Sequence, residues 1–303
     1  MAAISRAQLL KELLPGLNAL FGLEYNRYEQ EHKEIYTEYS SERSFEEDQK
    51  ITSFGNAPVK QEGAATLFDT AQEGYTTRYV METISMGFAL TQEAFEDNLY
   101  DSLSARYTKE LARSMANTKQ IKAAAVLNGA FDTSIGGDGK PLCATDHPTL
   151  GGADLRNELS TPADLSETSL EQALIDIAAF TDERGLKIAV QGVKLIIPKE
   201  LQFTADRIMK STLRVGTADN DINALRNMGM IPQGYTVNHY LTDTEAFFIK
   251  TDAPNGMKMF QRVAIKTGFE GDFDTGNVRY KARERYSFGF SDARGIFGSP
   301  GAA

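Results

Sequence analysis

Three residues whose side chains can do chemistry lie close together near the middle of the chain: Cys143, Asp146 and His147. A cysteine thiolate beside an imidazole is a nucleophile, and Cys, His and Asp are all zinc ligands. A closed zinc site needs about four ligands, and the other histidines, His32 and His239, belong to distant segments. We therefore interpret Cys143 and His147 as ordinary loop residues. A cytoplasmic enzyme with both in its site is the remote alternative.

The glycine-rich stretch Gly136-Gly137-Asp138-Gly139 is the second candidate. A phosphate-binding loop requires a P-loop or a dinucleotide fingerprint after a strand, and this stretch matches neither pattern. It also lacks the glutamate that a calcium-binding loop needs. A plain turn is the simplest interpretation, and we expect no catalytic residue, no cofactor and no metal in this protein.

The one concentrated positive surface lies in a strand pattern at residues 277–290. Its basic members are Arg279, Lys281, Arg283 and Arg285, and its apolar members are Val278, Tyr280, Ala282, Tyr286, Phe288 and Phe290. This alternation predicts a long strand with one basic and one largely apolar face. The basic face can meet nucleic-acid phosphates or pair with the acidic residues at 24–48, and the wide separation of opposite charges favours the pairing.

The composition narrows the class of protein. The chain has 303 residues and a formal charge of −10, which argues against a dedicated nucleic-acid binder. Cys143 is the single cysteine, so no intramolecular disulfide can form, and a reducing compartment fits. The sequence shows no apolar run that could cross a bilayer and no signal peptide, so we expect synthesis in the cytoplasm and no membrane contact.

One long helix is predicted to organise the chain, at residues 91–131. An apolar residue recurs every four positions along it, at Phe95, Leu99, Leu103, Tyr107, Leu111 and Met115. Asn128-Gly129 is a plausible end. The stripe lacks the charged flanks of a coiled coil, so we interpret the helix as a spine, and expect the 278–290 strand of the same subunit to cover the stripe.

The N-terminal region predicts a short amphipathic helix at residues 5–22 and then an acidic segment at 23–50. This segment is too polar to bury much area alone. Its aromatic residues are spaced like anchors for another surface: Tyr25, Tyr28, Tyr36, Tyr39 and Phe45. An arm that lies across a neighbouring subunit explains both properties, and a solvated acidic helix is the alternative.

Residues 74–90 are rich in β-branched and aromatic residues and predict one strand of roughly 50 Å, far longer than usual. We expect residues 52–68 to be its partner and residues 69–74 to form the tip. Neither face is cleanly apolar, so the hairpin should rest on another subunit, with Tyr75 and Tyr79 in the contact.

A second compact unit follows a loop stretch at 131–162. It reads as an α/β or α+β unit with helices at 168–185 and 200–210, strands at 187–197, 235–241, 246–250 and 257–264, and a hairpin turn at Asn255-Gly256. A capping box of Thr168 and Glu171 should start the first helix.

Taken together, the chain resembles the major capsid proteins of tailed phages, in the group of Mu-like major head subunits. The stretches that carry the likeness are residues 16–25 (GLNALFGLEY), 57–64 (APVKQEGA), 96–107 (EDNLYDSLSARY), 145–148 (TDHP) and 279–289 (RYKARERYSFG). The likeness is collinear and covers nearly the whole chain.

The resemblance implies the α+β Hong Kong 97-like capsid fold. It implies an N-arm at 1–50, an extended E-loop at 51–91, a peripheral (P) domain at 92–131 with 270–303, and an axial (A) domain at 132–269. It also implies a homo-oligomer of pentamers and hexamers, built in the host bacterial cytoplasm, that encloses double-stranded DNA without sequence-specific binding and resides in the virion.

The same resemblance implies a separate scaffolding protein, a portal and a decoration protein as partners. Some relatives cross-link through a lysine in the hairpin, but the setting of Lys60 does not match, and we expect no cross-link. The alternative is the shell of a cellular nanocompartment, an encapsulin, which has the same fold and packages enzymes.

Overall fold

The computed structural model describes residues 6–63, 65–91, 100–149, 151–214, 221–271 and 277–302. The helices are α1 (Arg6–Tyr25), α2 (His32–Ile35), α4 (Tyr100–Asn128), α5 (Glu167–Ala178), α6 (Gln202–Lys210) and α7 (Ala224–Met228), with short 3-10 helices η1 (Lys199–Leu201) and η2 (Ala293–Gly295). The strands are β1 (Thr37–Ser40), β2 (Phe45–Ile51), β3 (Glu73–Val80), β4 (Glu82–Leu90), β5 (Gly192–Ile197), β6 (Tyr235–Val237), β7 (Phe247–Thr251), β8 (Met257–Gly271), β9 (Val278–Phe290) and β10 (Ile296–Ser299).

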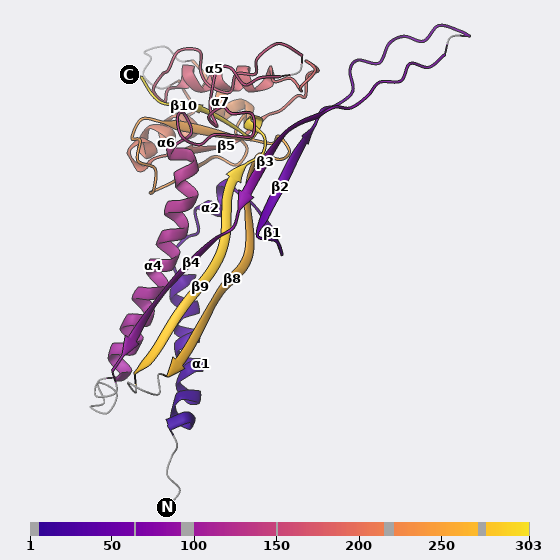
Figure 1. Cartoon of the computed structure of the whole chain (residues 1–303). Coiled ribbons are helices and arrows are strands. Elements are labelled where there is room, and N and C mark those ends of the chain that lie inside the picture. The colour runs from indigo at the N-terminus through magenta and orange to yellow at the C-terminus, as the bar shows by residue number, and fades with distance from the viewer. Residues whose placement is uncertain are drawn as a thin grey trace, which may run out of the picture.

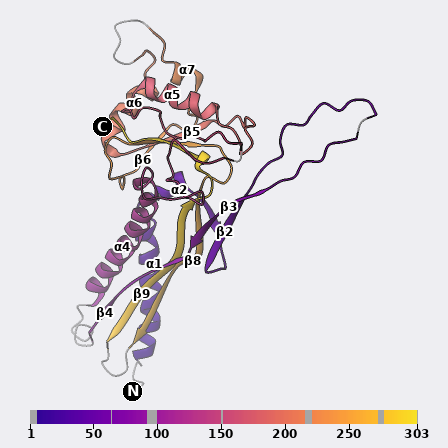
Figure 2. The ribbon, with the colours of Figure 1, turned by 45° about the horizontal axis from the view of Figure 1, so that its top comes forward.

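Two bodies and a projecting loop make up the molecule (Figures 1 and 2). In the elongated body, α4 and α1 lie beside the long strands β4, β9 and β8. In the compact body, α5, α6 and α7 surround the sheet of order β10-β7-β5-β6. The loop between β2 and β3 extends away from both bodies (Figures 1 and 2).

The elongated sheet has the order β1-β8-β9-β4, with β1 parallel to β8 and the other pairs antiparallel. The predicted alternation on β9 is confirmed. Tyr280 and Ala282 are buried against Leu111 and Met115 of α4, whereas the intervening basic residues are exposed at Arg279, Lys281 and Arg283. The strand of the same chain therefore covers the spine helix, as expected.

The spine helix α4 ends at Asn128, where the Asn-Gly signal predicted. Leu111 and Met115 are buried, but Tyr107 is 44% exposed and does not belong to the buried stripe. Phe95, Leu99 and the side chain of Leu103 lie outside the described residues. The stripe continues instead through buried Ala112, Ala123, Ala124 and Leu127, and the three alanines let other elements approach the helix closely.

The acidic N-terminal segment is not a loose arm in this chain, contrary to the prediction. After α1, which runs through Pro15-Gly16, residues 32–51 form α2, β1 and β2. β1 pairs with β8, and β2 pairs with β3. Burial of Ile35 and Tyr36 in the core of the same chain offsets the poor hydrophobicity of the segment.

The long hairpin differs from the prediction as well. Residues 74–90 break at Met81 into β3, which pairs with β2, and β4, which pairs with β9. Residues 52–68 form no strand among the described positions, because Gly55, Pro58 and Gly63 interrupt pairing. The loop closes at its base, where the Thr52 N–H donates to the Gln72 carbonyl at 2.9 Å, and it turns near Gly63, whose φ is +80°.

Most elements predicted for the compact body are present: α5, α6, β5 and β6 are shorter than predicted, and β7 is shifted by one residue. The strand predicted at 257–264 is instead the first part of the longer β8, which belongs to the elongated sheet. Ser166, not Thr168, caps α5, because the Ser166 side chain accepts a hydrogen bond from the Ser169 N–H. The turn at Asn255-Gly256 leads from one sheet to the other and does not close a hairpin, since β7 and β8 belong to different sheets. A domain boundary at residue 270 would cut through β8, so the strand pairing assigns β8 to the elongated body and β10 to the compact one.

Candidate functional site

The loop that carries Cys143 and His147 has a structural role. We call the hydrogen-bonded group of Asp138, His147 and Asn157 the clip. Cys143 is 1% exposed, and burial raises the pKa of its thiol well above the usual value. The thiolate that a nucleophile requires is therefore disfavoured. His147 Nδ1 lies 2.6 Å from Asp138 Oδ2, and Nε2 lies 3.1 Å from Asn157 Oδ1, so both ring nitrogens are occupied in holding the loop together.

Asn157 is the centre of this clip, and sequence reasoning missed it. Its amide nitrogen lies within hydrogen-bond distance of the carbonyls of Leu142 at 2.7 Å, Ala293 at 2.9 Å and Ile296 at 3.0 Å, and its oxygen accepts from the Ala144 N–H at 2.9 Å. It thereby joins the 132–158 loop to the chain around β10. A loop asparagine carries no sequence signal for such a role.

The described residues contain no group of side chains that could hold a metal ion. The helices formed by these residues also include none that is long and apolar enough to span a membrane. The stretch at 136–139 is a turn, closed by the Gly136 N–H donating to the Lys140 carbonyl at 2.8 Å. The loop thus provides support for the fold, and the surfaces of the chain are the better candidates for function.

The basic face of β9 forms a ridge at Arg279, Lys281 and Arg283. Opposite it on β4 stand Ser85, Gly87 and Ala89, which are small and exposed. A Cβ on Gly87 would approach the Tyr280 carbonyl to 2.7 Å, so a side chain at this position would require the backbone to shift. Arg285 was expected to be part of this ridge, but it is half-buried and its guanidinium lies near the Met81 carbonyl.

Acidic side chains of the N-terminal segment have partners elsewhere in the chain. Glu31 binds His239 at 2.6 Å, Glu34 binds Lys194 and Asp48 binds Lys258. These contacts join the segment to the compact body and to β8. The expected pairing of the acidic segment with the β9 ridge remains a prediction for contacts between subunits.

Three of the aromatic residues expected at subunit contacts are instead buried in this chain. The hydroxyl of Tyr25 donates to Glu284 at 3.1 Å, that of Tyr36 donates to the Ala123 carbonyl at 2.7 Å, and that of Tyr79 lies 2.5 Å from Ser291 Oγ. The three residues are 7%, 3% and 3% exposed. A tyrosine whose ring and hydroxyl are both satisfied internally has little left to offer a neighbour, so these three are corrected to core residues.

The other four lie nearer the surface. Tyr28, Tyr39 and Phe45 are 46%, 43% and 37% exposed, although Tyr39 stacks on Phe260. Tyr75 is half-buried, and its hydroxyl accepts a hydrogen bond from Lys50 at 3.0 Å. Their part in subunit contacts remains a prediction.

The loop between β2 and β3 carries a surface that the sequence analysis did not single out. Phe54, Val59, Leu67 and Phe68 are 59%, 95%, 73% and 91% exposed. Several large exposed apolar side chains on one projecting loop are a candidate interaction site. The signal in the sequence is a set of large apolar residues among strand-breaking glycine and proline, in a stretch where a paired strand is expected.

The root of this loop is fixed although its tip projects. Arg184 donates to Asp69 at 2.6 Å and to the Thr70 carbonyl at 2.7 Å. The Gly55 N–H and then Arg184 hold the pKa of Asp69 low, at about 2. Lys50 at the end of β2 lies 2.7 Å from Glu183 and 3.2 Å from Asp292. The root of the loop is thus held against the compact body, and the apolar side chains of the loop stay exposed.

Comparison with known proteins identifies a family and several solved structures that this chain resembles. A family described as phage capsid protein matches residues 74–298. The capsid chain of the native GTA particle is similar with a TM-score of 0.59 at 14% identity, and 91% of each chain is covered. The capsid chain of Cyanophage P-SCSP1u has a TM-score of 0.58 at 10% identity, covering 89% of this chain and 86% of that one.

The virus-like particle from Pyrococcus furiosus has a TM-score of 0.51 at 12% identity, covering 95% of this chain and 99% of that one. None of the curated proteins compared with this sequence matches it. At these identities the likeness shows the fold, and it confirms the α+β architecture expected for shells of the Hong Kong 97-like kind.

Proposed function

This chain belongs to the phage capsid protein family, and we propose that it assembles as pentamers and hexamers into the icosahedral shell of a tailed phage with a double-stranded DNA genome. It is a major capsid protein: its role is structural rather than enzymatic, and it resides in the virion capsid. The proposal concerns how the subunits associate and what they enclose.

The braced apolar loop is the observation that carries the proposal. Val59 and Phe68 are almost fully exposed in the isolated subunit, and leaving such side chains in water forgoes about 1.5–3 kcal/mol each relative to burial. Ion pairs at Lys50 and Arg184 fix the root of the loop. An apolar projection held at its root in this way is favoured when another copy of the subunit covers it.

The subunit would consist of an arm, an E-loop, a peripheral domain and an axial domain, with boundaries adjusted to the strand pairing. The arm spans residues 1–50, although α2, β1 and β2 bind the chain's own sheets. The E-loop spans 51–91, of which residues 52–72 project. The peripheral domain combines 92–131 with 270–303 and β8, and the axial domain comprises the rest of 132–269 with β10.

The contacts proposed between subunits follow from exposure. Tyr28, Tyr39 and Phe45 are the aromatic residues with surface left for a neighbour. The ridge at Arg279, Lys281 and Arg283 would meet acidic side chains of a neighbouring arm, or packaged DNA without reading its sequence. A scaffolding protein, a portal and a decoration protein complete the proposed set of partners. Membership of the Mu-like subgroup rests on the collinear stretches of sequence.

The experiment that tests this proposal alters the loop and leaves the subunit core intact. Val59→Ser combined with Phe68→Ser should give folded subunits with an unchanged melting temperature, because both side chains are exposed. Negative-stain electron microscopy should then show subunits or capsomers in place of closed shells. Normal yields of closed shells from this variant would refute the proposed role of the loop.

Phe203→Ser is the matched control. Phe203 is 73% exposed on α6, so its replacement removes a similar apolar area from a different surface, and shells should still form. The contents of shells produced with their natural partners separate the two candidates for the enclosed cargo. Double-stranded DNA supports the phage, and packaged enzymes without DNA support the nanocompartment.

A further inference from the structure

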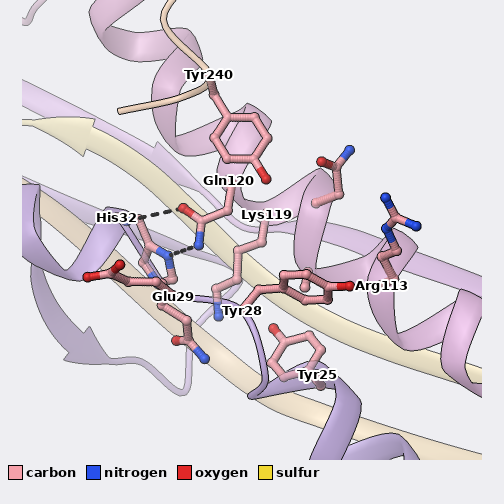
Figure 3. A pocket seen from close by; sticks show the side chains of 11 residues that line it. Tyr25, Tyr28, Glu29, His32, Arg113, Lys119, Gln120 and Tyr240 are labelled. Atoms are coloured by element: carbon pink, nitrogen blue, oxygen red, sulfur yellow. Dashed lines mark hydrogen bonds between the residues drawn. The ribbon is translucent and has the colours of Figure 1, made fainter. Parts of the chain in front are cut away.

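Ionisable groups are gathered where the N-terminal segment crosses α4 (Figure 3). They surround a cavity of about 140 Å³ between the end of α1, α2 and α4. His32 and Lys119, both of which line it, are 1% and 6% exposed, and neighbouring Glu284 is fully buried. Burying several ionisable groups together is costly unless each is paired, so their arrangement calls for an explanation.

His32 is held by a two-point contact with Gln120. The backbone N–H of His32 donates to Gln120 Oε1 at 3.1 Å, and Gln120 Nε2 donates to His32 Nδ1 at 3.0 Å (Figure 3). The amide offers one acceptor and one donor, and each is used. We call this pair of contacts the His32–Gln120 clasp. It requires His32 Nδ1 to carry no proton.

A proton on Nδ1 is incompatible with the clasp. The imidazolium would present two donors to Gln120, the backbone N–H and Nδ1–H, whereas the amide has only one acceptor. Rotating the Gln120 amide would satisfy the ring but set its NH₂ group against the backbone N–H. Either way, one buried donor loses its partner, which costs on the order of 1–3 kcal/mol.

The charged groups that face His32 act in opposite directions. Lys119 from α4 and Lys33 in α2 disfavour the imidazolium, whereas Glu38 from β1 favours it, with its Oε1 3.4 Å from Nε2. Burial of the ring is the largest effect. Burial and the two lysines outweigh Glu38 and lower the pKa of His32 from 6.5 to about 4. Glu29, Arg113 and Tyr240 lie farther out around the cavity.

A second set of buried groups adjoins the cavity from β9 and α1. Lys119 Nζ lies 3.6 Å from Glu284 Oε2, which also accepts the Tyr25 hydroxyl. Burial lowers the pKa of Lys119 and raises those of Glu284 and Tyr286. Three buried polar atoms here have no hydrogen-bond partner: His32 Nε2, Glu284 Oε1 and Tyr286 Oη. Solvating these atoms would favour opening of the contact between the N-terminal segment and α4.

We propose that the His32–Gln120 clasp is an acid-sensitive latch, which holds the α1–α2 segment on α4 at neutral pH and releases it when His32 gains a proton. The Tyr36 hydroxyl, which donates to the Ala123 carbonyl, is a further hydrogen bond from the segment to α4, whereas Glu31 and Glu34 bind His239 and Lys194 of the compact body. Release would remove the α1 side chains Leu17 and Phe21 from the apolar cluster around Leu111 and Met115 of the spine, which only β9 and its neighbouring strands would then cover. The latch thus couples pH to the surface that the subunit presents to its neighbours.

The direction of the effect follows from the lowered pKa. A histidine that is neutral when docked and protonates more readily when free favours docking above pH 6.5, and this preference is lost as pH falls from 6.5 towards 4. Each unit of difference is a tenfold change in the docking equilibrium. Glu284 opposes this trend, because its raised pKa favours the docked form in acid.

Hydrogen exchange of the full-length chain tests the latch. Amide protection in peptides covering residues 20–36 is measured from pH 7.5 to 4.5, with rates corrected for the intrinsic effect of pH. Protection should fall at least tenfold in acid, while peptides from α5 and β5 keep theirs. Loss of protection throughout the chain at the same pH, or no loss at residues 20–36, would overturn the proposal.

Two substitutions separate the latch from a general acid effect. In His32→Asn the side-chain oxygen can accept from Gln120 without titrating, so protection should stay constant with pH. In Gln120→Glu the carboxylate can accept from both His32 donors, so acid should no longer release the segment. Acid release in His32→Asn with the wild-type midpoint would refute the role of His32. Glu284→Gln, which removes the opposing group, should move the wild-type midpoint to higher pH.

Discussion

The hydroxyl of Tyr25, in the last turn of α1, donates a 3.1 Å hydrogen bond to the fully buried carboxylate of Glu284 in β9, although 259 residues separate the two. The bond joins α1, near the start of the chain, to the sheet that covers the spine helix. Lys119 of α4 completes the group with its ammonium 3.6 Å from the same oxygen. The N-terminal segment is therefore a structural part of its own subunit.

Removing this hydroxyl should destabilise the subunit. In Tyr25→Phe the ring packing remains, but Glu284 loses a donor while it stays buried, which we expect to cost about 1–3 kcal/mol. Urea unfolding of the unassembled subunit measures the loss. Tyr28→Phe, at a ring that is 46% exposed, should change stability by less than about 0.5 kcal/mol. Equal effects of both substitutions would contradict the assignment.

Asn157→Ala should be among the most damaging substitutions outside the apolar core. It leaves the Ala144 N–H, three carbonyls and His147 without their partner in a buried site. We expect a loss of about 3 kcal/mol or more of unfolding free energy, seen as a lower denaturant midpoint. Asn227→Ala, at an exposed position in α7, serves as the control and should be almost neutral. A small effect at Asn157 would show that water replaces the amide.

Asp138 should make stability depend on pH at the acid end. Burial alone would favour its neutral form, but hydrogen bonds from His147 and the Lys140 N–H hold the pKa of Asp138 below 3.8. Its contribution is therefore present in full above pH 3.8 and is lost as pH falls through the lower folded value. Asp138→Asn should lower the unfolding free energy at pH 7 by about 1.5–3 kcal/mol.

The same variant should also flatten the acid end of the curve. The difference in unfolding free energy between the wild type and Asp138→Asn should shrink as pH is lowered from 7 to 2.5, because protonation of Asp138 below pH 3.8 removes the charged form that the hydrogen bonds stabilise. Curves that stay parallel throughout would exclude Asp138 as the source of the dependence.

The basic ridge on β9 should control how assembly responds to salt. If Lys281 and Arg283 pair with acidic side chains of a neighbouring arm, raising the ionic strength should weaken assembly with or without DNA. Light scattering of assembling subunits measures this dependence. Lys281→Gln with Arg283→Gln should reduce it, and Lys109→Gln, at an exposed position on α4, should not. Salt sensitivity only in the presence of DNA would assign the ridge to the genome instead.

The sequence and the structure agree best where a pattern is local. The alternation along β9 specified both faces of the strand, apart from Arg285, and the four-residue spacing specified the face of α4 at Leu111 and Met115. The collinear stretches likewise identified the fold, which the comparisons confirm. The first two inferences depend only on the backbone repeat, and the third depends on the resemblance of those stretches to a known family.

The pairing partners of the strands and the burial of single side chains were harder to predict from the sequence. The sequence could not show that residues 74–90 divide between β2 and β9, because a strand edge accepts any partner whose register fits. Nor could it show that Tyr25, Tyr36 and Tyr79 turn inward while Tyr28 and Tyr39 stay exposed. An aromatic residue in a polar segment is equally suited to a neighbour's surface and to its own core.

The sequence by itself therefore determined the long helix and the two-faced strand, since both follow from the spacing of side chains along a regular backbone. Only the tertiary structure decided the braced apolar loop, the Asn157 clip and the contact of His32 with Gln120. Those features join residues that are far apart along the chain, and their energies depend on burial and hydrogen-bond geometry that no short stretch of sequence contains.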